Sequence, residues 1–231
     1  MNPVETGALS LLGAVLGLDV VSFPQAMLSR PLVAATLTGA LMGAPERGLI
    51  LGATLECFAL ETLPVGASRY PEWGSSSVVG GALVALPDVT GVQGAGTLVL
   101  AVIVALTWAW VGGWSMVQLR RLNAVWARRR HDAVARGSRS TVIGLQLYGM
   151  TADLVRGALM TAIGLTIFLP LAQFALARWS TPELPTRGVL MALAGIVAAG
   201  ATHKVFHAVS GTRWYMLAGL VIGAGLLVVL G

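Results

Sequence analysis

Apolar residues run along this chain in blocks that prolines, glycines and charged residues separate. Only two blocks, 95–117 and 157–177, approach the roughly 20 residues that a helix needs to cross a bilayer. The pattern predicts an all-α polytopic membrane protein with short, broken and re-entrant helices, built as two related halves around a central basic loop. The other blocks cover residues 7–18, 31–43, 48–63, 77–87, 141–150, 188–202 and 214–230.

Composition supports the membrane class. Hydrophobic residues make up 56% of the chain and charged residues 11%, and the mean hydropathy is +0.80. A soluble domain of this length does not tolerate such values. Small residues four positions apart allow helices to approach closely, and such pairs occur at Gly13/Gly17, Gly39/Gly43, Gly48/Gly52 and Gly219/Gly223.

The net charge of +5 comes largely from one segment. Seven of the fifteen basic residues lie between 120 and 139, so the positive-inside rule places this segment in the cytoplasm rather than on nucleic acid. The predicted organisation is a membrane half at 1–119, a basic cytoplasmic loop or interfacial helix at 120–140, and a second membrane half at 141–231. Apolar residues at helical spacing favour the interfacial helix, although a purely topological signal remains an alternative: Leu119, Leu122, Val125 and Trp126.

Glu56 is the most informative polar residue, because it lies within an apolar block that breaks at Pro64 and Gly66. A carboxylate inside a membrane costs several kcal/mol unless a polar group meets it, so it marks a candidate functional site. Glu61 lies about 140° further around a helix and does not pair with Glu56 on one face. We expect Glu61 to be solvated at a cavity mouth.

Other chemistries find little support. The single Cys57 excludes an intrachain disulfide and a CxxC site. His203 and His207 are four residues apart, but no third metal ligand is obvious. Ser75, Ser76 and Ser77 lack the Gly-x-Ser-x-Gly elbow of a serine hydrolase. We therefore predict no catalytic residue, no metal and no cofactor.

Four runs of sequence together resemble a known family. They are Gly17–Asp19, Pro24–Ala34, Gly43–Glu56 and Leu63–Ala67. In order and spacing they are similar to the membrane component IIC of mannose/fructose/sorbose-type phosphotransferase systems, most specifically over residues 13–90. Residues 145–157 and the glycine-rich terminal helices agree more loosely.

The resemblance implies a subunit that carries a hexose across the bacterial inner membrane together with a IID membrane subunit, in an oligomer. A phosphorylated IIB, which works with IIA, would then phosphorylate the sugar, so this chain itself needs no phosphorylated residue. Neutral sugars are held by carboxylates, amides and exposed backbone. The residues implied to contact the sugar are Glu56 first, then Gln25, Thr54, Gly66, Ala67, Ser68 and Glu72.

Some residues depart from the family pattern. Glu72 follows Pro71 where the family often has aspartate, and Glu61 and Arg69 are charged where smaller or apolar residues are expected. A degenerate, non-transporting regulatory subunit therefore remains an alternative. Glu56 could likewise be structural and paired with a buried arginine such as Arg156.

Overall fold

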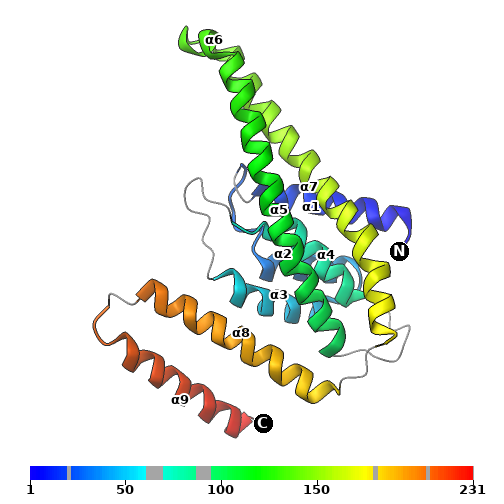
Figure 1. The fold of residues 1–231 in the computed structure, drawn as a ribbon, viewed down its shortest axis with the longest axis vertical. Helices are drawn as coiled ribbons and strands as arrows, with labels where there is room; N and C mark the ends of the chain where they lie inside the picture. Colours follow the sequence, from blue (N-terminus) through cyan, green and yellow to red (C-terminus); the bar gives the residue numbers. More distant parts are fainter. Residues whose placement is uncertain (20–21, 61–69, 87–94, 179–181, 207–208, 231) are drawn as a thin grey trace.

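The computed structural model describes residues 1–19, 22–60, 70–86, 95–178, 182–206 and 209–230, in which helices are joined by turns and no strand occurs. Figure 1 shows their arrangement. The helices are α1 (Pro3–Asp19), α2 (Pro31–Leu41), α3 (Pro45–Ala59), α4 (Trp73–Ala85), α5 (Ala95–Arg129), α6 (His131–Ala135), α7 (Arg139–Leu176), α8 (Glu183–Phe206) and α9 (Thr212–Leu230).

Three helices are long and apolar enough to cross a membrane: Gly96–Arg129, Arg139–Leu176 and Leu184–Lys204. The predicted all-α membrane fold is therefore confirmed. The separate blocks at 141–150 and 157–177 are parts of the single helix α7. The polar residues between them do not end the helix, because Asp153 and Arg156, one turn apart, form an ion pair within it.

The core forms where the short helices α1–α4 pack against α5 and α7. Its fully buried side chains include Leu51, Leu55, Val78 and Val79. Prolines begin α2 and α3 at their first helical position, where no backbone N–H is needed. The turn between these two helices ends at Gly43, whose φ of +76° favours glycine.

Glycines set the close spacing of this core. A Cβ added at Gly48 would lie 2.4 Å from the carbonyl oxygen of Ala35, so α3 meets α2 backbone to backbone. A Cβ at Gly157 would lie 2.9 Å from the carbonyl oxygen of Gly13, so α7 also lies close to the backbone of α1. The small-residue pairs around Gly13 and Gly48 are therefore true helix contacts.

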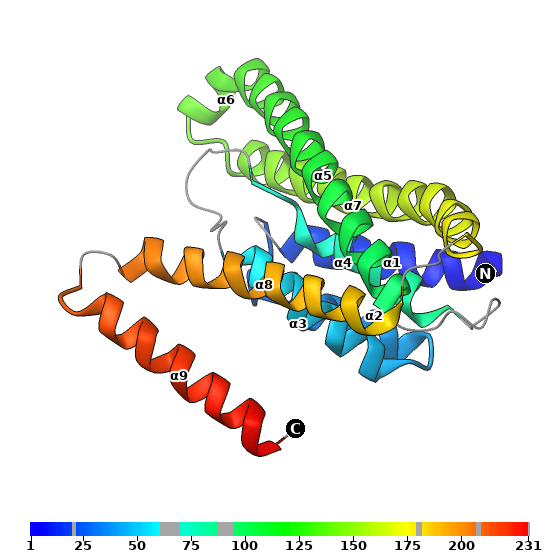
Figure 2. The same ribbon diagram turned by 60° about the horizontal axis from the view of Figure 1, so that its bottom comes forward.

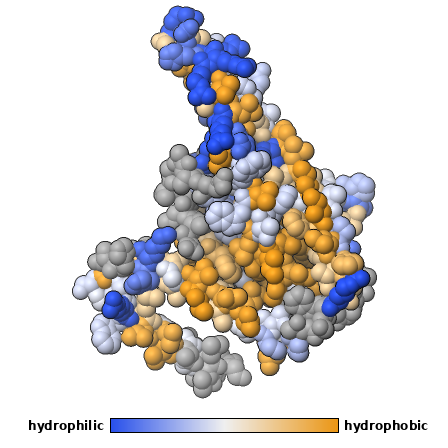
Figure 3. Space-filling view, viewed as in Figure 1, coloured by the Kyte–Doolittle hydropathy of each residue, from blue (hydrophilic) through white to orange (hydrophobic). Residues whose placement is uncertain are grey.

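The segment 120–140 is mostly helical. α5 continues unbroken through Arg129, α6 forms the tip, and α7 begins at Arg139, so the helices run through the boundaries expected near 119 and 141. α5 has 35 residues and α7 has 38, which makes them roughly 52 and 57 Å long. Since a hydrocarbon core is about 30 Å thick, the hairpin projects well beyond it. Figure 3 shows a hydrophilic tip above a hydrophobic body.

The apolar side chains of this projecting segment turn partly toward α7. Leu119 and Trp126 line a cleft between α5 and α7, and Trp126 lies 6.0 Å from the ring of Tyr148 on α7. Their helical spacing thus serves packing within the hairpin rather than contact with lipid alone.

The last two helices form a separate hairpin beside the core (Figure 2). α8 packs against α3 and α5, whereas α9 makes few contacts with α8. The side chains of α8 that face the core include Leu190, Ala194 and Ala201. Most of its other large apolar residues are exposed, and so are most of those described on α9.

Candidate functional site

Glu56 lies near the C-terminal end of α3 and forms an ion pair with Arg30, the residue before α2. Arg30 Nε donates to Glu56 Oε1 over 2.6 Å and a second guanidinium nitrogen contacts the same oxygen. The backbone N–H of Leu32 donates to Oε2 over 3.2 Å, so the first turn of α2 also meets the carboxylate.

The Arg30–Glu56 pair is only partly covered. The side chain of Arg30 is 25% exposed and that of Glu56 is 23% exposed. The alternative partner considered for Glu56, Arg156, is wrong, since Arg156 pairs with Asp153 and Glu72 instead. The correct partner comes from the turn before α2, because that turn folds back over the end of α3.

A buried carboxylate holds the turn that carries Arg30. Asp19, at the end of α1, is 2% exposed and accepts hydrogen bonds from the backbone N–H of Ala26 over 2.7 Å and of Ser29 over 2.8 Å. Lipid cannot satisfy such backbone groups, which explains a carboxylate at this position.

Gln25 lies on the same turn and is exposed. It has a φ of +58°, and Met27 a φ of +61°. Non-glycine residues in this left-handed region cost about 1 kcal/mol or more each and persist only where the surroundings hold them. The hydrogen bonds of Asp19 provide that hold. Gln25 thus lies on the turn that also carries Arg30, the ion-pair partner of Glu56.

Glu72, also predicted to contact the sugar, lies at the start of α4. It is fully buried and caps the N-terminus of α4, where Oε1 accepts from the backbone N–H of Ser75 over 3.0 Å and Oε2 accepts from the Ser75 hydroxyl. Its own N–H donates to Ala109 O over 2.8 Å. A carboxylate at a helix N-terminus is well stabilised, so the geometry makes Glu72 a structural cap.

Arg156 completes a buried ionic network on α7. Its Nε donates to Asp153 Oδ1 over 2.8 Å, and its Nη1 lies 3.9 Å from Glu72 Oε2. The other oxygen of Asp153 accepts from the hydroxyl of Ser22 over 3.0 Å. The network therefore connects the turn after α1 to the start of α4 through α7.

Sequence reasoning did not assign Asp19 and Asp153. Each is a charged residue in or beside an apolar helix, which was the available signal. Asp153 and Arg156 are also three residues apart, a spacing that places them on one helix face.

Thr54 does not join Glu56. It is 5% exposed and its hydroxyl donates to the carbonyl of Ile50 over 2.8 Å, within its own helix. Two residues apart on a helix, Thr54 and Glu56 point in nearly opposite directions. That both contact one ligand stays a prediction. Further predicted residues lie outside the described part of the chain: Glu61, Gly66, Ala67, Ser68, Arg69 and His207.

A family model described as the PTS system sorbose-specific IIC component matches residues 6–189, which are 184 of the 231 residues. This chain belongs to that family. The resemblance seen in the sequence is confirmed. The family match includes the Arg30–Glu56 pair and the whole buried network.

Individual IIC proteins are similar at lower identity. The sorbose-specific EIIC component of Klebsiella pneumoniae is 27% identical over 171 residues, 74% of this chain and 61% of that protein. The fructose permease IIC component of Bacillus subtilis (strain 168) is 27% identical over 200 residues, 87% of this chain and 71% of that protein. This IIC-family chain thus spans about three fifths of its sorbose relative.

Two solved structures share the fold of this IIC-family chain. One, described as a membrane protein, superposes with a TM-score of 0.74 at 18% identity and covers 100% of this chain and 95% of that chain. A chain from the cryo-EM structure of the mannose transporter ManYZ with microcin E492 (MceA) has a TM-score of 0.63 at 19% identity, with the same coverage.

Proposed function

We propose that this protein is the sugar-translocating IIC subunit of a phosphotransferase-system permease in the bacterial inner membrane. It moves a hexose to the cytoplasmic side, where a phosphorylated IIB partner, supplied by IIA, phosphorylates it. The family membership supports this role, and so does the match to relatives named for sorbose and fructose. No catalytic residue of this chain takes part in the phosphorylation.

The observation that carries the proposal is the partly exposed Arg30–Glu56 pair, whose arginine lies on the same turn as Gln25. A neutral sugar needs both donors and acceptors for its hydroxyl groups. Arg30 offers donors, the Glu56 carboxylate offers acceptors, and the Gln25 amide offers both. The three residues lie on or against one turn that Asp19 holds in place.

Membrane partners follow from the exposed apolar surface. Side chains on α8 and α9 such as Ile196 (69% exposed) and Leu220 (70% exposed) have no cover within the described chain. We propose that a IID membrane subunit and further protomers cover part of this surface, and lipid the rest.

A non-transporting regulatory subunit is less well supported. Burying ionic groups is costly. A chain without transport function would gain nothing from keeping the partly exposed ion pair of Arg30 and Glu56 inside a membrane. The family matches also point to sugar-specific components.

The test measures sugar uptake and membrane abundance of Glu56→Gln side by side. Cells carrying the full set of partner components are supplied with labelled mannose, fructose and sorbose in turn. Loss of charge-assisted hydrogen bonds costs roughly 1.5–3 kcal/mol, so uptake should fall about tenfold to hundredfold at normal abundance. The matched control is Glu46→Gln, because Glu46 is an exposed carboxylate in the first turn of the same helix.

A double variant separates binding from structure. If Glu56 only neutralises Arg30, abundance should fall in Glu56→Gln and recover in Arg30→Gln/Glu56→Gln, with uptake recovering in parallel. Undiminished uptake by Glu56→Gln at normal abundance would remove Glu56 from the sugar site.

A further inference from the structure

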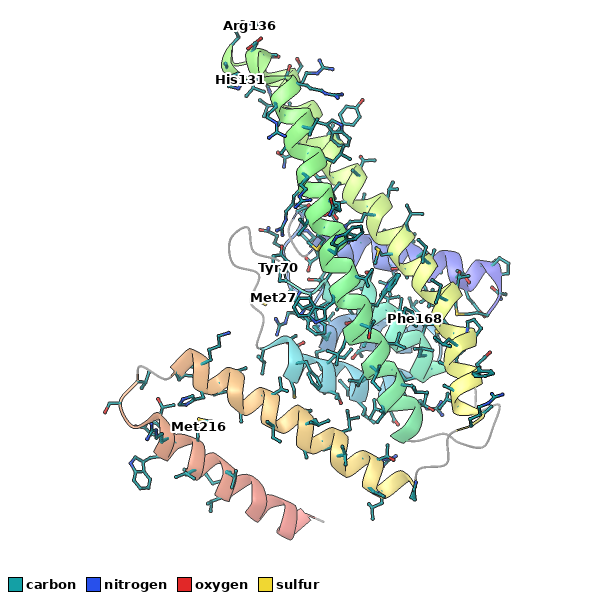
Figure 4. All side chains as sticks on the ribbon, in the orientation of Figure 1. Met27, Tyr70, His131, Arg136, Phe168 and Met216 are labelled. Atoms are coloured by element: carbon teal, nitrogen blue, oxygen red, sulfur yellow. The ribbon has the colours of Figure 1, made fainter. Side chains whose placement is uncertain are left out.

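The projecting part of the α5–α7 hairpin contains a cleft of about 700 Å³. Its inner end is formed by Asp153 and Ser22, which belong to the buried network. Its outer end reaches His131 at the tip, labelled in Figure 4. The cleft therefore runs from the polar centre of the protein toward the basic tip.

The polar groups of the cleft change along its length. On α7, Asp153 and Gln146 lie at the inner end and middle, seven residues or about 10 Å apart. Asn123 faces them from α5, and its buried Oδ1 has no hydrogen-bond partner among the described residues. Toward the tip the charged groups are cationic, namely Arg128 and His131. Arg120 also lines the cleft, inward of Asn123, and contacts the hydroxyl of Tyr70. The amides of Asn123 and Gln146 therefore lie between this arginine and the two outer cations.

The cleft also provides a flat apolar surface. Trp126 lines it between the amides and the cations, and an aromatic ring suits the C–H face of a sugar ring. Acyl chains fit less well, because this part of α5 carries Arg120, Arg121, Arg128 and Arg129 and lies beyond the apolar section that can sit in hydrocarbon.

We propose that this cleft binds the phosphorylated hexose, the product, before its release into the cytoplasm. The inference rests on the proposed transport function and adds a second ligand position to it. The sugar hydroxyls face Asn123 and Gln146, the ring lies on Trp126, and the phosphate meets Arg128 and His131. At the inner end Asp153 is paired with Arg156 and Arg120 contacts the Tyr70 hydroxyl, so Arg128 and His131 are the cations that draw the phosphate toward the outer end.

The test is isothermal titration calorimetry of this protein in phosphatidylcholine nanodiscs. The probes are mannose 6-phosphate, fructose 1-phosphate, mannose and inorganic phosphate. At least one hexose phosphate should bind more tightly than both unphosphorylated mannose and inorganic phosphate. Arg128→Gln should weaken that binding about tenfold. The control Arg121→Gln removes the same charge from an exposed position on α5 outside the cleft and should leave binding unchanged.

A second variant tests the sugar part of the site. Gln146→Leu should weaken hexose phosphate binding and leave inorganic phosphate binding unchanged. The control is Gln118→Leu, since Gln118 is a partly exposed residue of α5 that does not line the cleft.

Several results would overturn the proposal. The first two are equal binding of inorganic phosphate and hexose phosphate, and equal effects of Arg121→Gln and Arg128→Gln. The third is absence of hexose phosphate binding. The fourth is loss of hexose phosphate binding in phosphatidylglycerol nanodiscs, because lipid then occupies the cleft. Glu56-dependent uptake without hexose phosphate binding would overturn this inference and leave transport intact. Cleft binding without any uptake would overturn the proposed function instead.

Discussion

Glycines in the core and in the last two helices have opposite surroundings. A Cβ added at Gly48 or Gly157 would collide with the backbone of another helix, whereas one added at Gly195 or Gly219 would meet nothing within 4 Å. All four residues are glycines, and Gly48 and Gly219 each belong to a pair of glycines four positions apart. Small-residue pairs thus permit close helix contact, and a partner helix decides whether the contact forms.

Charge and exposure divide the same two regions. The core buries Asp19, Glu72, Asp153 and Arg156, which stabilise one another and the broken backbone. The described part of α8 and α9 instead exposes large apolar side chains, such as Trp214 at 76%. Large apolar side chains are exposed in the first region too, such as Leu11 at 67%, but that region also has a buried ionic network of its own, which the described part of α8 and α9 lacks.

Arg156→Met should have the largest effect on stability. It leaves the buried carboxylates of Glu72 and Asp153 without their cation, at a cost of about 3–5 kcal/mol. Thermal unfolding of the detergent-purified protein and its monodisperse yield both measure the loss. Arg213→Met on α9 is the control in the other region, since Arg213 is exposed, and it should change little. Equal losses from both variants would contradict the division between the regions.

Gly48→Ala should come next. The added methyl group meets the backbone of α2, and such overpacking costs about 1–3 kcal/mol. Gly195→Ala adds the same methyl group where space is open and should stabilise α8 by up to about 1 kcal/mol through helix propensity. Melting temperatures of the two variants, measured in one detergent, give the comparison. If Gly195→Ala destabilises the complex with partners but not the purified chain, a partner helix packs there.

Trp108→Phe should have the smallest effect of the three. The indole Nε1 of Trp108 donates to the carbonyl of Met160 over 2.9 Å and joins α5 to α7. Losing that bond should cost about 1 kcal/mol. Trp214→Phe is the matched control on exposed α9 and should leave the unfolding midpoint unchanged. A larger loss from Trp214→Phe would show that α9 is packed in the purified protein.

Residue patterns predicted much of the helix layout. The proline-bounded apolar blocks correspond to α2 and α3, and the long blocks to α5 and α7, because helix starts and membrane spans depend on local composition. Glu56 stood out as a charge in an apolar block. Its partner did not, because Arg30 lies 26 residues away and only the folded turn brings the two together.

What the sequence by itself determined was the membrane class, the basic tip and the family, since each depends on residue types and their order along the chain. Tertiary structure alone decided that Glu72 is a cap, that Thr54 points away from Glu56, and that Asp19 and Arg156 support the site. These roles depend on which backbone groups and charges meet across helices. Such pairings follow from packing in three dimensions, where a residue's neighbours come from distant parts of the chain.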